Sequence, residues 1–202
     1  MTLEAKQVSF SYAGQGQEGV LRQVSLTIRP GERVGLSAPS GRGKTTLCKL
    51  LAGYERPDSG QIHLGGKPLA SFRGFCPVQM IWQHPETALD PLLRLGETLR
   101  EAGPVEQRLL DALHISPAWL SRYPGELSGG ELQRFCIARV LRPGLRFLLC
   151  DEITAMLDLI TQAQIWRFLM EEADRRRLGL LIVSHNRQLL KALCTRVEQL
   201  EE

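Results

Sequence analysis

The chain has 202 residues, 43% of them hydrophobic and 23% charged, which are ordinary proportions for one globular domain. A net charge of +3, with scattered basic residues, gives no argument for a nucleic acid partner. No stretch approaches the roughly 18 apolar residues that a membrane helix needs, and we see no signal peptide, so we expect any membrane role to come through a partner protein. Five dispersed cysteines without CxxC spacing indicate reduced thiols in a cytosolic protein.

The beginning of the chain is predicted to be rich in β-structure. Residues 8–12 and 24–28 alternate between apolar and polar side chains, and a Gly/Gln-rich turn over residues 14–19 separates them. Residues 61–64 run into Gly65-Gly66, as in one half of a hairpin. Since alternation is typical of sheets with one covered face, we expect antiparallel strands here.

A glycine-rich loop follows a short strand predicted over residues 33–36. After the loop, leucines at helical spacing predict a helix that ends near Gly53. A strand-to-helix turn of this kind directs backbone N–H groups inward, where they cradle polyphosphate. Lys44 can reach the β- and γ-phosphates, and the Thr45 hydroxyl can ligate Mg²⁺. The loop reads Ala38, Pro39, Ser40, Gly41, Arg42, Gly43, Lys44, Thr45 and Thr46.

Ala38 is a departure from the general phosphate-loop pattern, which has glycine at this position. If the position requires positive φ, alanine costs on the order of 1 kcal/mol. If φ is negative, the cost is small. Both outcomes are compatible with the sequence.

The middle of the chain differs from its flanks. From about residue 97 to 141 the patterns are mostly helical and are interrupted by Pro104, Pro117 and Pro124. We therefore expect one domain, with a catalytic core formed by about residues 1–84 and 143–202. A helical lobe of about residues 85–142 would be inserted into that core.

The end of the chain returns to an α/β pattern. Residues 147–150 and 180–183 are wholly apolar, and a helix predicted over about residues 160–177 separates them. Strands that are apolar on both faces, joined by a helix, indicate a parallel sheet. The cluster Arg175-Arg176-Arg177 is interpreted as a solvated helix end.

Asp151 and Glu152 directly follow the apolar strand over residues 147–150. The C-terminal ends of parallel strands face the ligand crevice of an α/β sheet. There Asp151 can hold a metal ion through water, and Glu152 can deprotonate an attacking water. The alternative, two acids that merely stabilise the next helix, is weaker beside a phosphate loop.

Residues 127–134, Leu-Ser-Gly-Gly-Glu-Leu-Gln-Arg, resemble the LSGGQ-type signature of the ABC ATPase family. Glu131 stands where glutamine is commonest. The resemblance covers nearly the whole chain and implies a P-loop NTPase fold of the RecA-like type. That fold has a parallel-sheet core, N-terminal antiparallel strands and an inserted α-helical subdomain.

Four further residues resemble family motifs, and they occur in the family's order. Tyr12 corresponds to the aromatic residue that stacks on adenine, and Gln83 to the Q-loop residue that senses Mg²⁺ near the membrane subunit. Asp158 is retained from the D-loop, and His185 corresponds to the switch histidine that contacts the γ-phosphate. Asn186 replaces the commoner aspartate after it, which we expect to be a mild change.

The resemblance implies a mechanism in which two subunits sandwich ATP. The phosphate loop of one subunit faces Ser128, Gly129 and Gly130 of the other, so one chain holds half of each site. Glu152, His185 and Lys44 would be catalytic, with ATP and Mg²⁺ as cofactors and with Thr45, Gln83 and Asp151 near the metal. The implied partners are a second ATPase subunit, permease subunits and, indirectly, a solute-binding protein, at the cytoplasmic face of a membrane.

Two stretches narrow the family resemblance. Residues 80–91 resemble the segment after the Q-loop in oligopeptide and nickel importers, and residues 150–158 resemble the second ATPase of nickel and metal-opine importers. These imply an importer of nickel, metal chelates or peptides that works as a heterodimer, with a homodimer as the alternative. The sequence reaches Glu202 soon after a strand predicted near Val197, without the further strands and extension of peptide-importer ATPases.

A soluble ABC ATPase of translation or DNA repair is the competing class. Such proteins carry two ATPase units or a long coiled coil, and neither is found in this sequence. A P-loop kinase would lack the signature turn, and a GTPase would need an NKxD motif that we do not find.

Overall fold

The computed structural model describes residues 1–12, 19–101 and 103–200. Its centre is a five-stranded, wholly parallel sheet in the order β6-β7-β8-β3-β9. The strands are β3 (Arg33–Ser37), β6 (Val78–Ile81), β7 (Phe147–Asp151), β8 (Gly179–Val183) and β9 (Arg196–Gln199). The predicted parallel core is thereby confirmed.

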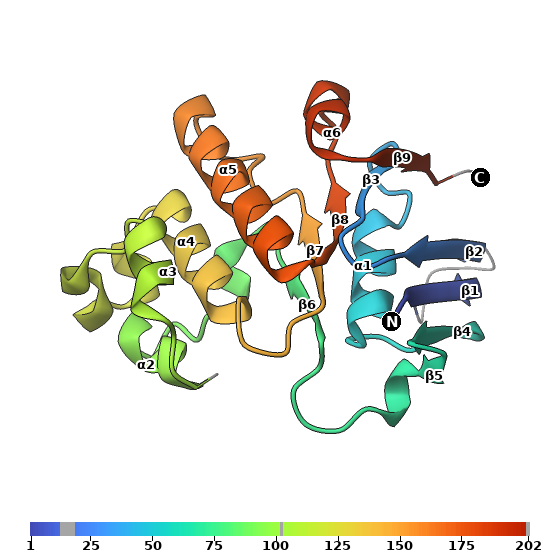
Figure 1. Ribbon diagram of the computed structural model, residues 1–202, viewed down its shortest axis with the longest axis horizontal. Coiled ribbons are helices and arrows are strands. Elements are labelled where there is room, and N and C mark those ends of the chain that lie inside the picture. The colour runs from blue at the N-terminus through green and yellow to red at the C-terminus, as the bar shows by residue number, and fades with distance from the viewer. Residues whose placement is uncertain (13–18, 102, 201–202) are drawn as a thin grey trace.

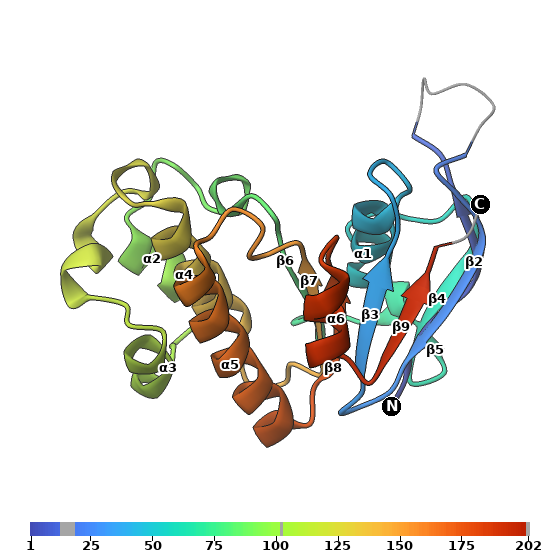
Figure 2. The same cartoon turned by 90° about the horizontal axis from the view of Figure 1, so that it is seen from above.

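A second sheet is antiparallel and has the order β2-β1-β4-β5. Its strands are β1 (Leu3–Phe10), β2 (Leu21–Ile28), β4 (Ser59–Leu64) and β5 (Lys67–Pro68). Helix α1 (Lys44–Ala52) lies between the two sheets (Figure 2). The turn expected over residues 14–19 falls, except for Gly19, outside the described residues.

The central strands β7 and β8 are buried on both faces, as their apolar sequences predict. Alternate side chains therefore enter two different cores. Leu148 and Ile182 pack with the helices on one face, while Leu149 and Val183 pack with α1 and the antiparallel sheet on the other. These cores hold the C-terminal ends of the strands in fixed positions.

The helical lobe stands at one end of the parallel sheet, on the side away from α1 (Figures 1 and 2). Buried Arg142 joins its parts by donating hydrogen bonds to the backbone oxygens of Leu99 and Gly103. The elements of the helical lobe are α2 (Leu95–Glu101), α3 (Gln107–Ala112), α4 (Gly129–Val140), and 3₁₀ turns at Pro85–Thr87, Pro117–Ser121 and Pro124–Glu126. Another 3₁₀ turn, Leu69–Ser71, follows β5 in the core.

Helix α5 (Leu159–Arg176) corrects one expectation about charge. The arginine cluster at its end was predicted to be solvated, and Arg175 and Arg177 are exposed. The side chain of Arg176 is only 14% exposed, however, and donates to buried Glu172 at 2.9 Å. Arg175 donates to the same carboxylate, as does Arg108 from α3. The cluster therefore neutralises a buried acid and joins the lobe to the core.

Strand β6 and helix α6 (Arg187–Leu193) are among the elements that the sequence pattern does not predict. Strand β6 has only four residues, one of them polar Gln79, and a strand this short shows no reliable hydrophobic period. Helix α6 has seven residues and begins at Asn186, whose side chain accepts hydrogen bonds from two backbone N–H groups. Among the described residues, every helix is too short or too polar to span a bilayer.

Candidate nucleotide site

The site lies where four neighbouring parallel strands end. Strand β3 leads into the phosphate loop, β7 ends at Asp151 and Glu152, β8 is followed by His185, and β6 by Gln83. Because all four strands run in the same direction, these residues meet at one edge of the sheet. Predictions that are far apart in the sequence are thus brought together.

A cavity of about 470 Å³ opens at this edge. Its wall combines the phosphate loop, the aromatic residue after β1 and the residues that follow three strands. The lining residues are Tyr12, Val20, Ser40, Gly41, Gly43, Lys44, Thr45, Thr46, Gln83, Glu152 and His185. Nearly all of the residues predicted for one half-site therefore face a common space.

The phosphate loop has the backbone that its glycines predict. Gly41 and Gly43 have φ of 80° and 78°, in the left-handed region that favours glycine. A Cβ at Gly43 would also lie 2.7 Å from a methyl group of Leu21. Ala38 does not have positive φ, so alanine in place of glycine at this position costs little backbone strain.

Lys44 lies inside the loop and is 6% exposed. Its Nζ donates to the carbonyl oxygens of Ala38 at 2.8 Å and Pro39 at 2.9 Å. These bonds hold a buried ammonium group in the centre of the loop, with a third donor left for a ligand. The site is thus prepared for a polyanion.

Asp151 is 2% exposed and accepts a hydrogen bond from the Thr45 side chain. Burial raises the pKa of this carboxyl group and neighbouring Glu152 adds to the rise, while the Thr45 hydrogen bond, Lys44 and Lys49 oppose it. A carboxylate and a hydroxyl are the oxygen ligands that Mg²⁺ prefers. These two side chains therefore fit a magnesium ion.

Glu152 and His185 contact each other directly at the site. Nε2 of His185 lies 2.7 Å from Oε1 of Glu152, and the glutamate side chain is 13% exposed. Glu152 has φ of 49°, and its N–H donates to the carbonyl oxygen of Val183. A carboxylate at the cavity wall can accept a proton from water, the step required of a general base.

Tyr12 stands at another wall of the cavity and is part of an aromatic cluster. Its hydroxyl lies 3.4 Å from Oγ1 of Thr46, and its ring packs edge-on against Phe10 at 4.8 Å. Nζ of Lys49 lies 5.9 Å from the Tyr12 ring centre and 5.6 Å from that of Trp82. Lys49 thus links the predicted adenine-stacking residue to the neighbour of Gln83.

Sequence reasoning missed Lys49 and Trp82. The available signal for Lys49 is its position three residues after Thr46, which places the two on the same face of α1. Trp82 is adjacent to the predicted Gln83, but nothing in the sequence indicates that its ring approaches Lys49. That contact depends on the packing of β6 against α1.

The predicted signature and D-loop residues do not line this cavity. Ser128 is the N-cap of α4, and Asp158 is the N-cap of α5. The two helix starts are neighbours, because a Cβ at Gly130 would contact a methyl group of Leu157 at 3.3 Å. The structure therefore gathers Ser128, Gly129, Gly130 and Asp158 into a second group, separate from the phosphate loop. Arg42 and Asp151 are adjacent in the sequence to residues that line the cavity, but they do not line it themselves.

A glycine loop between a buried strand and a helix, with an acidic strand end beside it, defines a nucleoside-triphosphate-binding protein of the P-loop class. The known proteins that this chain resembles agree with that class. The sequence pattern of the family described as "ABC transporter" matches residues 21–155. The chain belongs to the ABC transporter family, and it is an ATP-binding, ATP-hydrolysing subunit of that family.

Individual relatives give the same result. The chain is 37% identical to the nickel import ATP-binding protein NikE of Rhodospirillum rubrum, over 91% of this chain and 73% of the relative. It is 36% identical to a putative peptide import ATP-binding protein of Brucella abortus, over 91% of this chain and 61% of that protein.

Solved structures support the fold. An ATP-binding subunit of an ABC transporter is 26% identical and superposes with a TM-score of 0.84, over 100% of this chain and 86% of the other. An ATP-binding cassette solved as a dimer with ADP and Pi is 22% identical, with a TM-score of 0.83 over 98% and 94% of the two chains. The predicted fold class is confirmed.

Proposed function

We propose that this chain energises an importer of nickel, metal chelates or peptides, as one of two ATPase subunits that sandwich ATP at the cytoplasmic face of a membrane. The observation that carries the proposal is the separation of two groups of residues. One group surrounds the cavity with Lys44, and the other presents Ser128 at the start of α4. A nucleotide between two subunits can contact both groups at once.

Each half-site residue has a role that its position supports. Lys44 and the amides of residues 40–46 bind phosphate, and Tyr12 stacks on the base. Glu152 accepts the proton of the attacking water, and His185 orients the γ-phosphate. Asp151, Thr45 and Gln83 would hold Mg²⁺, which neutralises phosphate charge when bound.

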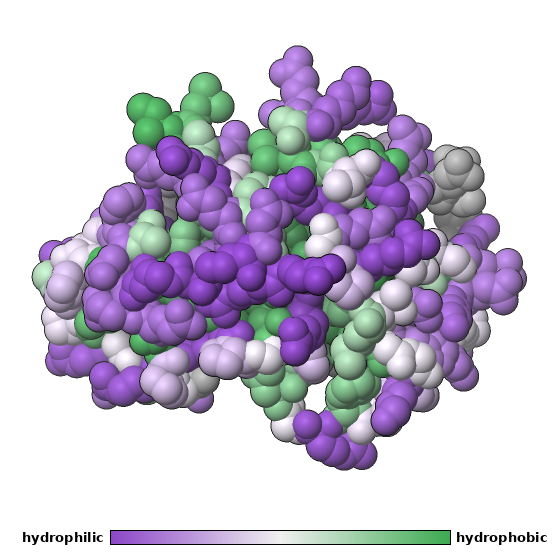
Figure 3. Space-filling view, in the orientation of Figure 1, coloured by the Kyte–Doolittle hydropathy of each residue, from purple (hydrophilic) through white to green (hydrophobic). Residues whose placement is uncertain are grey.

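An exposed apolar tip supports a protein partner next to the signature group. Met156, Leu159 and Ile160 are 73%, 81% and 72% exposed, and they flank Asp158. Hydrophobic side chains protrude at the beginning of α5 in Figure 3. Apolar side chains gathered in this way favour contact with another protein over contact with water. We assign this tip to the second ATPase subunit.

The domain division follows from these assignments. Residues 85–142 would form the helical subdomain that carries the signature, and residues 1–84 and 143–202 the catalytic core. The cargo class rests on the relatives, which are described as nickel and peptide import proteins. Permease subunits and a solute-binding protein would then complete the transporter.

Nucleotide-dependent association tests the sandwich. The full chain, together with its companion ATPase subunit, is examined by light scattering with and without ATP and Mg²⁺. We expect the mass of the complex to increase only with nucleotide, and we expect Lys44→Ala to abolish the increase. A mass that is independent of nucleotide would refute the sandwich. Uptake of radioactive nickel and of labelled peptide, in cells that lack the chain, then tests the cargo.

A further inference from the structure

In the signature turn, the carboxylate of Glu131 accepts hydrogen bonds from the Ser128 groups that could otherwise bind a ligand. The backbone N–H and the hydroxyl of Ser128 both donate to Oε2 of Glu131, each at 2.8 Å. The backbone N–H of Glu131 in turn points to the Ser128 hydroxyl at 3.4 Å. This reciprocal pattern is a capping box at the start of α4.

The same donors are those that the sandwich needs for the γ-phosphate. A serine hydroxyl carries one proton, so Ser128 cannot donate to Glu131 and to a phosphate at the same time. Its backbone N–H is likewise engaged. In this conformation, the strongest donors of the turn are therefore already occupied by an internal carboxylate.

Glu131 is held in its charged form. The backbone N–H and hydroxyl of Ser128 lower the pKa of its carboxyl group, burial opposes them, and Arg122 and Arg134 lower it further. Arg134 itself donates to the carbonyl oxygen of Leu113 and to Gln164, so it does not draw Glu131 away from Ser128. The carboxylate also occupies the positive end of the helix dipole.

Capping the helix does not require this charge. A glutamine at the same position can also accept the Ser128 N–H. Ser128 and Gly129 are exposed, and a Cβ at Gly129 would have no neighbour within 4 Å. The turn is therefore accessible to an anion on another subunit. Glu131 is an acidic group in direct contact with the N–H and hydroxyl donors of Ser128.

We propose that Glu131 competes with the γ-phosphate of ATP for the Ser128 donors, so that the carboxylate must turn away before the two subunits close. This inference rests on the proposed sandwich and assigns a positioning role to a residue outside the cavity. It predicts that removal of the charge, with its size and capping bond retained, tightens the ATP-bound dimer.

The test compares Glu131→Gln with the chain that retains Glu131, both in a Glu152→Gln background. The companion subunit is present with its own general base replaced as well, because the ATP that faces Ser128 lies on the companion's phosphate loop. The ATP concentration that gives half-maximal association is measured by light scattering. We expect Glu131→Gln to lower it about two- to fivefold, the size of effect expected when a charge at a helix N-terminus is removed. Affinity for ADP, which lacks the γ-phosphate, should not change. The melting temperature should fall slightly, because the charge also stabilises the N-terminus of α4.

Glu97→Gln is the matched control. Glu97 accepts the Arg94 N–H at 3.0 Å in the first turn of α2, so the same charge is removed from a similar cap in the same lobe. We expect no change in ATP-dependent association for this variant. An equal ATP dependence in Glu131→Gln and the unaltered chain would overturn the inference. If Ser128→Ala still weakens association while Glu131→Gln has no effect, the proposed sandwich holds but the competition by Glu131 does not. If ATP causes no association in any variant, both the sandwich and the competition are refuted.

Discussion

Nε2 of His185 lies 2.7 Å from Oε1 of Glu152, and this contact joins the ends of two adjacent parallel strands. The Glu152 backbone is in the left-handed region, which costs a non-glycine residue on the order of 1 kcal/mol. The hydrogen bond from the Glu152 N–H to the carbonyl oxygen of Val183 on β8 stabilises that conformation. The sheet thus positions the carboxylate and the imidazole as a pair facing the cavity.

Replacement of Glu152 tests its role as a general base. Glutamine keeps the size of the side chain but cannot accept a proton from water, so Glu152→Gln should bind ATP and hydrolyse it about 10²- to 10⁴-fold more slowly. Phosphate release measures the turnover, and retention of labelled ATP measures the binding.

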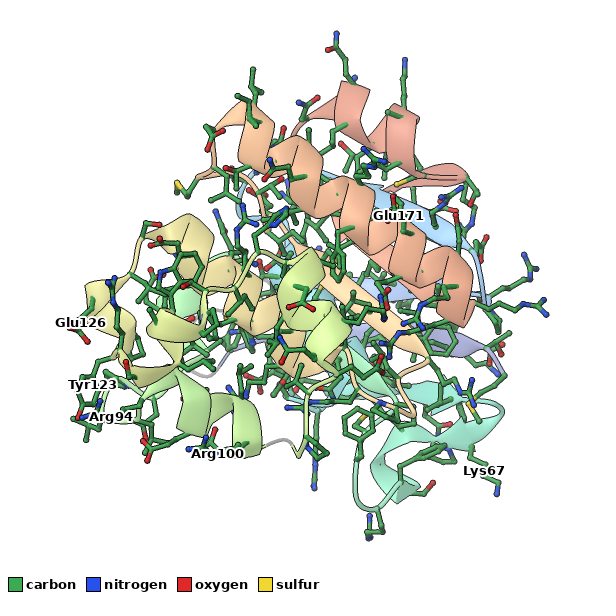
Figure 4. The ribbon with its side chains drawn as sticks, turned by 60° about the vertical axis from the view of Figure 1, so that its left-hand side comes forward. Lys67, Arg94, Arg100, Tyr123, Glu126 and Glu171 are labelled. Carbon is green, nitrogen blue, oxygen red and sulfur yellow. The ribbon has the colours of Figure 1, made fainter. Side chains whose placement is uncertain are left out.

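Glu171 on α5 provides the control for this charge change. It lies on the outer face of the helix, where its side chain is 65% exposed and pairs with Arg167 (Figure 4). Glu171→Gln should leave turnover unaltered. If Glu152→Gln also retains the full rate, the general-base assignment fails.

Lys44→Ala should weaken nucleotide binding, because it removes a charge-assisted contact to the phosphates. The expected loss is about tenfold or more in Kd. The carbonyl oxygens of Ala38 and Pro39 would also lose their donor, which should lower the free energy of unfolding by about 1–3 kcal/mol. A fluorescent ATP analogue and urea unfolding measure the two effects. Lys67→Ala, exposed on β5 (Figure 4), should change neither, and normal ATP affinity in Lys44→Ala would contradict the site.

Glu172 should make stability depend on pH. Burial raises the pKa of its carboxyl group, but hydrogen bonds from Arg108, Arg175 and Arg176 outweigh burial and lower it from 4.5 to about 2. The charged form therefore stabilises the fold above pH 4.5, and this contribution is lost as pH falls from 4.5 towards 2.

The variant Glu172→Gln isolates this effect. It should lose on the order of 3 kcal/mol of unfolding free energy at pH 7 and progressively less as the pH is lowered towards 2. Urea unfolding at several pH values measures the difference from the unaltered chain. Glu171→Gln serves again as the exposed control, and a pH-independent difference for Glu172→Gln would argue against the ion cluster.

Lys49 should report nucleotide binding through Trp82. A base stacked on Tyr12 would shift the ammonium group that lies near both rings, so ATP should change the tryptophan emission. Lys49→Met retains the aliphatic chain and removes the charge. We expect it to abolish most of the emission change and to weaken ATP binding about two- to fivefold. Trp82→Phe should abolish the same change, and a persisting signal in that variant would place its source elsewhere.

Residues whose role depends on near neighbours in the chain could be predicted from the sequence alone. The glycines before Lys44 set the loop backbone, Ser128 and Asp158 cap the helices that follow them, and the apolar run before Asp151 is a buried strand. Hydrogen bonds over a few residues and regular periodicity create these features, so they are readable without the fold.

Which of these residues contact one another depends on the three-dimensional packing of the chain. It placed Gln83 beside the phosphate loop through a short strand that has no clear period, and it buried Glu172 under three arginines from two helices. It also separated Ser128 from the cavity and brought Lys49 near Trp82. Such contacts depend on how sheets and helices pack, and packing joins residues that have no fixed spacing along the chain.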